Sequence, residues 1–329
     1  MKRHLVTGAG GFIGNHLVSY LKDIGCWVAG VDLKYPSFSQ SRADDFMIAD
    51  LRDQTQCLRV MAGMHEVYAC AADMGGMGFI ADPQMQAEIL YNNTLINLNS
   101  IEAAREAEVR RYLFTSSVCV YPTHQLATTH PVPLREQDVY PALPQASYGW
   151  EKLQAEHFCT YYQSYGLQTR IARFQNCYGP LGAWHGGREK APAALSRKIA
   201  VAKLTGNPEI EIWGDGEATR VFMYVSDCVR GIYRLMQSDY SGPVTLGPDR
   251  AISINDLADL LASIAGIEII KKHTEGPEGV RGRAFDHTVA TETLKWQPAV
   301  SLEEGLAITY KWVEGQVYAY DTDYAKTAE

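Results

Sequence analysis

The sequence predicts an α/β fold in which a doubly wound parallel sheet carries helices on both faces, with a smaller C-terminal α+β unit. Two observations predict it. In the first half, short apolar segments alternate with segments of helical spacing, which is typical of a parallel sheet. After residue 176, glycines and aromatic residues become frequent and this alternation is lost. We expect residues 1–176, with a returning segment of about 219–250, to form the sheet domain, and residues 177–329 to form mainly the second unit.

The expected elements of the first half come from their local patterns. Short apolar runs predict strands, and stretches in which apolar residues recur every three or four positions predict helices. The strands are expected at residues 4–7, 27–32, 67–72, 112–117 and 169–174, and the helices at 12–21, about 85–106 and 147–165.

The second half has a more mixed pattern. An amphipathic helix is expected to begin near Ser253 or Asn255, because both side chains can cap a first turn. The other expected elements are a loop at 178–187, helices at 189–204 and 302–317, strands at 211–213 and 221–225, and a glycine-rich loop at 276–282.

Composition and charge exclude several classes of protein. The chain has 329 residues, of which 46% are hydrophobic, and its net charge of -8 argues against binding to a nucleic-acid backbone. No apolar run approaches the roughly 20 residues that a membrane span needs. The chain reaches its first strand almost at once, so we expect no signal peptide. Its seven cysteines have no metal-ligand spacing, which indicates a cytoplasmic protein with reduced thiols and no metal site.

A glycine-rich turn follows the first expected strand and opens the first expected helix. Its sequence is Gly-Ala-Gly-Gly-Phe-Ile-Gly, residues 8–14. Glycines make the turn tight and let a pyrophosphate approach the backbone, while the helix N-terminus offers N–H groups to the phosphates. This is the dinucleotide-binding signature of a Rossmann sheet. The residues expected to hold the dinucleotide here are Gly8, Gly11, Phe12, Ile13 and Gly14.

A carboxylate at the end of the second expected strand indicates which dinucleotide binds. Asp32 can hydrogen-bond both ribose hydroxyls of NAD and would repel the 2′-phosphate of NADP, although Lys34 lies nearby. We therefore expect NAD. Asp50 and Leu51 are expected beside the adenine, although a surface aspartate needs no such role.

A tyrosine and a lysine four residues apart predict a redox step. Tyr148 and Lys152 lie on one face of an expected helix. A nearby ammonium favours the phenolate, so we expect Lys152 to lower the pKa of Tyr148 and to let it take a proton from a sugar hydroxyl. Ser117, at the carboxyl end of a strand, can hydrogen-bond the same hydroxyl. The alternative is a surface pair that meets by chance.

Together, the glycine turn, Ser117, Tyr148 and Lys152 resemble the extended short-chain dehydrogenase/reductases that modify nucleotide sugars. The segment Arg-Val-Phe-Met-Tyr-Val-Ser-Asp at 220–227 also resembles a strand of that family. Cys119 follows Ser117 by two residues and is expected to face the same site. A cysteine is a competent acid or base when a neighbouring cation lowers its pKa, and the alternative is a buried structural thiol.

Three further segments are closely similar to the GDP-mannose 3,5-epimerase family. They are residues 72–79, 176–194 and 276–283, and the similarity runs from the first strand to about Val317. It implies that Cys119 and Lys190 are the two acid/base groups, although a lysine at a helix start is usually solvated. Oxidation at C4 makes the protons on C3 and C5 acidic, and two groups on opposite faces can then invert each centre. Which of the two is the base at each centre stays open.

The resemblance also implies a set of substrate contacts and a reaction. The reaction would convert GDP-D-mannose into GDP-L-galactose and GDP-L-gulose without net use of NAD. The implied contacts to the GDP-sugar are Gly75, Ser117, Cys119, Asn176, Glu189, Lys190, Lys198, Arg220, Arg281 and possibly Arg283. The chain departs from the resembled family in three places. Ala218 stands where the plant enzymes have a glutamine, the loop after Phe79 is longer than in the plant enzymes, and the tail after Val317 does not match the family.

Two other functions are compatible with parts of the pattern. A GDP-4-keto-6-deoxymannose epimerase-reductase shares Ser-x-Cys and Tyr-x-x-x-Lys but uses NADPH and pairs its cysteine with a histidine. Asp32 and Lys190 argue against it, although His185 lies near. A non-catalytic NAD-binding regulator is the other alternative. A homodimer through the helices at 85–106 and 147–165 would follow the superfamily, but core packing explains their apolar faces equally well.

Overall fold

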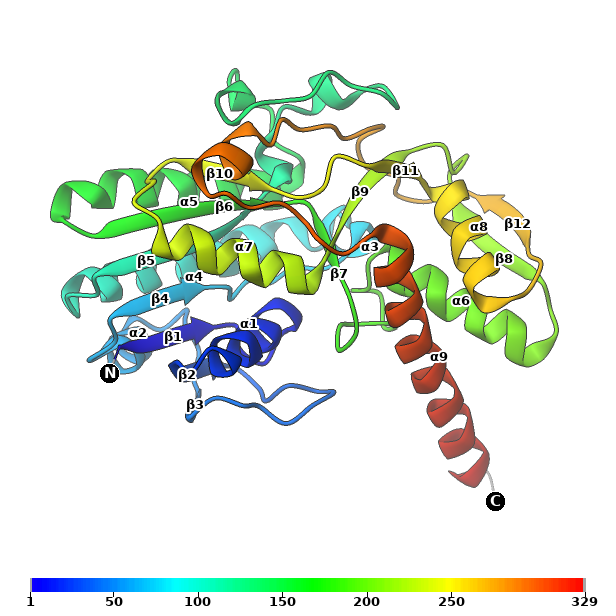
Figure 1. Cartoon of the computed structure of the whole chain (residues 1–329), viewed down its shortest axis with the longest axis horizontal. Coiled ribbons are helices and arrows are strands. Elements are labelled where there is room, and N and C mark those ends of the chain that lie inside the picture. The colour runs from blue at the N-terminus through cyan, green and yellow to red at the C-terminus, as the bar shows by residue number, and fades with distance from the viewer. Residues whose placement is uncertain (1, 328–329) are drawn as a thin grey trace.

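A sheet of seven parallel strands forms one half of the molecule (Figure 1). The computed structural model describes residues 2–327, with side chains to residue 320. The strand order β10-β6-β5-β4-β1-β2-β3, parallel throughout, confirms the predicted doubly wound sheet. The strands are β1 (Arg3–Thr7), β2 (Trp27–Asp32), β3 (Asp45–Ile48), β4 (Glu66–Ala69), β5 (Arg111–Ser117), β6 (Gln168–Phe174) and β10 (Pro243–Leu246).

Helices cover both faces of this sheet, and each face has its own apolar core. On one face the core joins α1 (Phe12–Asp23) and α7 (Val225–Gln237) to the strands. On the other it joins α2 (Gln54–Met61), α4 (Gln86–Glu106) and α5 (Ala146–Tyr162). Among the described residues, no helix is both long enough and apolar enough to span a membrane.

The second half of the molecule packs beside the carboxyl ends of the large sheet (Figure 1). It holds a three-stranded sheet, β11-β9-β7, and a parallel pair, β12-β8. Its own core is formed mainly by three helices and these strands. The elements are β7 (Asn176–Tyr178), β8 (Glu209–Trp213), β9 (Thr219–Tyr224), β11 (Ala251–Ser253), β12 (Ile270–Thr274), α6 (Ala191–Thr205), α8 (Ile254–Ala265) and α9 (Leu302–Thr327).

The chain passes back and forth between the two halves. At β7 it enters the second half, and after β9 it returns through α7 to place β10 at the edge of the large sheet, beside β6. The return therefore begins at Val225 rather than at residue 219, because β9 pairs with β7 and β11.

Several elements differ from the sequence-based expectation. Five strands, β3, β7, β10, β11 and β12, were not predicted, because they are short and each lies at the edge of its sheet. The helices α2 and α7 were also missed. The helix predicted from Glu189 begins at Ala191, where Pro192 suits a first turn that needs no N–H from that residue. The last helix continues beyond Val317 to Thr327.

A buried ion pair fixes α5 against the sheet. The two carboxylate oxygens of Glu156, on α5, accept hydrogen bonds from the Arg173 guanidinium on β6 at 2.9 and 2.7 Å. Ser116, on β5, donates to the same carboxylate at 2.5 Å. All three side chains are buried. This network therefore sets the position of α5 relative to the carboxyl ends of β5 and β6.

Candidate functional site

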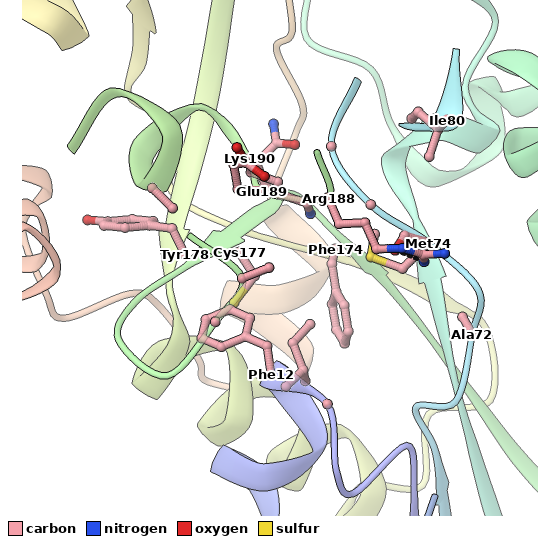
Figure 2. Close-up of a pocket in the computed structure, with 18 of the residues that line it drawn as sticks. Phe12, Ala72, Met74, Ile80, Phe174, Cys177, Tyr178, Arg188, Glu189 and Lys190 are labelled. Carbon is pink, nitrogen blue, oxygen red and sulfur yellow. Dashed lines mark hydrogen bonds between the residues drawn. The ribbon is translucent and has the colours of Figure 1, made fainter. Parts of the chain in front are cut away.

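A cavity of about 910 Å³ lies at the carboxyl ends of the large sheet, where it meets the second half of the molecule (Figure 2). It collects side chains from both halves, as expected for a ligand site in this class of sheet. The sequence-predicted residues that line it are Gly8, Gly11, Phe12, Ile13, Gly14, Asp32, Asp50, Leu51, Gly75, Ser117, Cys119, Tyr148, Lys152, Asn176, Glu189, Lys190, Lys198, Arg220 and Arg283.

The glycine turn forms one end of the cavity. Gly8 has a φ of 68°, in the left-handed region that favours glycine. Gly14 has no space for a side chain, because a Cβ there would collide with the carbonyl oxygen of Gly8. Gly11, at the N-cap of α1, has no side chain to cap the first turn, and Phe12 and Ile13 of that turn line the cavity. This arrangement fits a pyrophosphate.

Asp32 lies next to this turn, at the end of β2. Its carboxylate accepts a hydrogen bond from the N–H of Gly10 at 3.0 Å and from that of Lys34 at 3.3 Å. These bonds hold the carboxylate at the mouth of the turn, where a ribose diol can reach it.

Asp50 also lines the cavity, but its carboxylate is engaged. Arg52 binds it in a bidentate manner, with Nε 3.0 Å from Oδ1 and Nη2 2.6 Å from Oδ2. The hydrogen bonds from Arg52 hold the pKa of Asp50 below its usual value. Asp50 is therefore ionised at neutral pH, and only part of its hydrogen-bonding capacity remains for a ligand.

Tyr148 and Lys152 share one face of α5, and both are buried. The Lys152 ammonium lies 5.4 Å from the centre of the Tyr148 ring and 3.6 Å from the carboxylate of Glu151. Ser117 ends β5, and its hydroxyl accepts the N–H of Cys119 at 3.1 Å. The predicted pair and its serine therefore reach the same cavity.

The expected direction of the Tyr148 pKa shift is wrong for the protein alone. Burial raises the pKa of the phenol well above its usual range, and the charges of Glu151 and Cys119 add to this, while the Ser117 hydroxyl opposes it. The Lys152 ammonium lies 3.6 Å from the Glu151 carboxylate, whose negative charge offsets that of the ammonium. A positive charge bound beside the phenol would act in the opposite direction and favour the phenolate.

Cys119 lines the cavity, as predicted, but not because it continues the strand two residues after Ser117. The strand ends at Ser117, and residues 118–120 form a 3-10 turn that brings the thiol to the same side. Its Sγ lies 3.6 Å from Nη2 of Arg283 and 3.7 Å from Oε1 of Gln145.

Lys190 lies at the N-cap of α6 and points into the cavity (Figure 2). Burial lowers the pKa of its amine, the nearby Cys177 and Cys119 thiols oppose this, and Arg283 adds to the lowering. The amine therefore loses its proton more readily than a solvated lysine, which suits a general base. Lys190 is therefore not a solvated surface lysine, which is the usual situation at the start of a helix.

The remaining predicted contacts are held by protein partners. Glu189 pairs with Arg197 at 3.1 Å and accepts the N–H of Gly187 at 2.7 Å. The amide of Asn176 donates to the carbonyl of Val221 at 3.3 Å.

The predicted cations differ in their surroundings. Lys198 donates to the carbonyl of Glu211 at 2.7 Å. Burial, followed by the charge of Arg283, lowers the pKa of Arg220 to about 10. Arg281 does not line the cavity; its guanidinium pairs with the exposed carboxylate of Asp215. Of the two predicted arginines in that loop, only Arg283 is brought to the site.

Sequence reasoning missed several residues that organise the site. Gln145 accepts a hydrogen bond from Arg283 at 2.6 Å and contacts the Cys119 thiol, so it holds the two together. Asp73 and Arg188 form an ion pair at 2.8 Å on the cavity wall. Asp73 and Arg188 lie inside the segments 72–79 and 176–194, whose resemblance to the epimerase family could have drawn attention to them. No feature of the sequence points to Gln145.

Comparisons with known proteins agree with this geometry. The model of the NAD dependent epimerase/dehydratase family matches residues 4–247. GDP-mannose 3,5-epimerase of Arabidopsis thaliana is 44% identical over 315 residues, which cover 95% of this chain and 82% of that protein. The similarity extends well beyond the glycine turn and therefore includes both halves of the cavity.

Solved structures show the same arrangement of chain. UDP-glucose 4-epimerase of Thermotoga maritima with UDP-glucose matches with a TM-score of 0.83 and 27% identity, over 96% of this chain and 99% of that one. UDP-glucose 4-epimerase of Thermus thermophilus in complex with NAD matches with a TM-score of 0.80 and 25% identity, over 95% of this chain and 99% of that one.

Proposed function

Because the chain belongs to the NAD dependent epimerase/dehydratase family, we propose that it epimerises GDP-D-mannose at C3 and C5. The products would be GDP-L-galactose and GDP-L-gulose, formed through transient oxidation at C4. The observation that carries the proposal is that one cavity brings together Cys119, Tyr148 and Lys190, and that burial lowers the pKa of the Lys190 amine. The 44% identity to a GDP-mannose 3,5-epimerase supports the same substrate.

The chain's own groups would divide the work. NAD, when bound, accepts a hydride from the sugar and later returns it. We assign to Tyr148 the transfer of the C4 hydroxyl proton, with Ser117 hydrogen-bonded to the same oxygen and Lys152 supporting the phenolate. With C4 as a ketone, the neighbouring C–H bonds become acidic. Cys119 and Lys190 would then remove and return protons on opposite faces of C3 and C5.

The remaining predicted contacts would bind the ligands. We assign the dinucleotide to the glycine turn, Asp32, Asp50, Leu51, Tyr148 and Lys152. We assign the GDP-sugar to Gly75, Asn176, Glu189, Lys198, Arg220 and Arg283. In this scheme residues 1–176, with α7 and β10, form the NAD-binding domain, and most of the remaining chain binds the nucleotide sugar.

The epimerase-reductase alternative is less well supported. Its cysteine would need a histidine partner, and the ring of His185 packs against Trp184 and Tyr320, with ring centres 4.3 and 5.9 Å apart. Lys190 lines the same cavity as Cys119, and burial lowers the pKa of its amine. Asp32 at the glycine turn also disfavours NADPH.

The decisive test is incubation with GDP-mannose and NAD in deuterated water. We expect deuterium at C3 and C5, two epimeric products, and no net change in NADH absorbance. Loss of NADPH absorbance with the 4-keto-6-deoxy substrate, together with no turnover of GDP-mannose, would establish the epimerase-reductase instead. Intact, unlabelled GDP-mannose would indicate a non-catalytic NAD-binding protein.

We also propose a cytoplasmic homodimer. Large apolar side chains are exposed along α4, at Leu90, Tyr91 and Leu98, and along α5, at Trp150 and Tyr161. The two helices pack side by side, so a second copy can cover both at once. Sedimentation should give twice the chain mass of 36.5 kDa, and Trp150→Glu should shift it toward the monomer. A wild-type protein that sediments at 36.5 kDa would contradict the dimer.

A further inference from the structure

One arginine joins two loops from different halves of the molecule beside the cavity. Arg188 lies in the segment between β7 and α6 that leads to Glu189 and Lys190. This segment contacts the one that follows β4. The N–H of Gly76 donates to the carbonyl of Arg188 at 3.0 Å. A side chain at Gly76 would collide with the carbonyl of Glu189, so the two backbones are in direct contact.

The Arg188 side chain makes all its described contacts with the loop after β4. Its Nη1 lies 2.8 Å from Oδ1 of Asp73 and donates to the carbonyl of Met74 at 3.1 Å. The guanidinium carbon lies 3.8 Å from the centre of the Phe79 ring. Figure 2 shows this side chain extending toward Met74, while Glu189 and Lys190 follow it in the chain. The side chain is 48% exposed, so its ion pair contributes little to folding stability.

Asp73 is itself held by two buried asparagines of α4. Its N–H donates to Oδ1 of Asn93 at 2.6 Å, and Nδ2 of Asn93 donates to its carbonyl at 3.0 Å. Nδ2 of Asn92 donates to Oδ2 of Asp73 at 3.1 Å. The carboxylate that receives Arg188 is therefore fixed to the helix layer of the large sheet.

The same asparagines reach two other parts of the site. Asn93 donates to Glu151 at 2.9 Å, and Glu151 contacts the Lys152 ammonium at 3.6 Å. Asn92 accepts a hydrogen bond from Arg52, the partner of Asp50, at 3.0 Å. A network of hydrogen bonds and ion pairs therefore extends from the dinucleotide end of the cavity, past the redox pair, to the loop of Lys190.

We propose that Arg188 is a positioning residue for the proton transfers. Through Asp73 it fixes the loop so that the Lys190 amine stays on its side of the sugar ring. This role rests on the proposed epimerase function. The competing role for a cavity-lining arginine is direct binding of the substrate diphosphate, which would leave the loop unchanged when Arg188 is removed.

The test compares Arg188→Met and Asp73→Asn with wild type in deuterated water, using GDP-mannose and NAD. Both should slow deuterium entry about 10- to 100-fold, because a small displacement of a reacting group has that effect. Arg188→Lys keeps a cation near Asp73 and should recover much of the rate. Arg42→Met is the matched control, since the Arg42 side chain is about as exposed as that of Arg188, pairs with Asp23 at 2.7 Å and does not line the cavity.

Three further readouts separate positioning from other roles. The double variant should be no slower than the slower single one, because both remove the same contact. Affinities for GDP and NAD should stay within about twofold of wild type. Amide hydrogen exchange in residues 72–80 and 180–190 should become faster in both variants. Amide exchange does not depend on catalysis. It therefore shows whether Arg188 and Asp73 hold the two loops together even if wild type is inactive on GDP-mannose.

Three results would overturn the proposal. Near-wild-type deuterium entry in Arg188→Met would show that the loop needs no such contact. Weaker GDP binding with an unchanged rate at saturation would make Arg188 a substrate ligand. If the variants have lower thermal stability and lose C4 oxidation and deuterium entry to the same extent, the Arg188–Asp73 pair has only a structural role.

Discussion

Replacement of Tyr148 by Phe is expected to stop deuterium entry at both C3 and C5 of GDP-mannose. Neither carbon is acidic until C4 has been oxidised, so loss of the group that takes the C4 hydroxyl proton removes every later step. The rate should fall by about two to four orders of magnitude, the usual contribution of a general acid or base. Mass spectrometry and NMR of the recovered nucleotide sugar measure it.

The matched control is Tyr165→Phe. Tyr165 is exposed on the same side of the sheet and does not line the cavity, so its variant should behave as wild type. NAD should still bind to Tyr148→Phe, because the glycine turn is unchanged. If Tyr148→Phe labels C3 or C5 at a rate near that of wild type, the oxidation step does not depend on this phenol.

Lys190→Ala and Cys119→Ser are expected to separate oxidation from epimerisation. Each should lower deuterium entry by about two to four orders of magnitude while NAD stays bound and C4 oxidation, seen as NADH absorbance in a single turnover, remains. The two variants should differ in which carbon retains slow exchange, which would assign the base at each centre. Lys203→Ala, an exposed lysine paired with Glu314 at 2.9 Å, is the control.

The pH dependence follows from the burial of Lys190. Burial lowers the pKa of this amine, and its base form is the deprotonated one, so exchange should rise with pH through a value below that of a solvated lysine. The rising limb should disappear in Lys190→Ala. If the rise of exchange with pH persists in Lys190→Ala, the scheme with two acid/base groups is wrong. The same conclusion follows if Lys190→Ala or Cys119→Ser epimerises at near wild-type rate.

The sheet and the glycine turn could be predicted because their signals are local. Apolar runs specify strands, and the turn needs glycine at positions such as Gly14, where a side chain has no room. Tyr148 and Lys152 could be placed together because four residues span one helical turn. The sequence did not show how deeply Tyr148 is buried or that Glu151 lies near it. Burial and the charge of Glu151 raise the pKa of Tyr148, opposite to the expected shift.

Other parts of the site depend on contacts between distant segments. Arg281 and Arg283 are indistinguishable by type and spacing, but the fold directs one toward Asp215 and the other toward Cys119. Gln145 meets Arg283 across 138 positions of sequence, and Arg188 meets Asp73 across 115. No periodicity or motif encodes such pairings.

The course of the chain between the halves limits how this protein can be divided. A fragment that stops at residue 176 would lack β10, which leaves the backbone edge of β6 open for pairing with other chains. It would also lack α7, which supplies Val225, Ile232 and Leu235 to the core under α1. The second half of the molecule is likewise not a contiguous segment that could be exchanged for that of a relative. New specificity in this scaffold would therefore arise from point changes in the loops around the cavity rather than from recombination of whole domains.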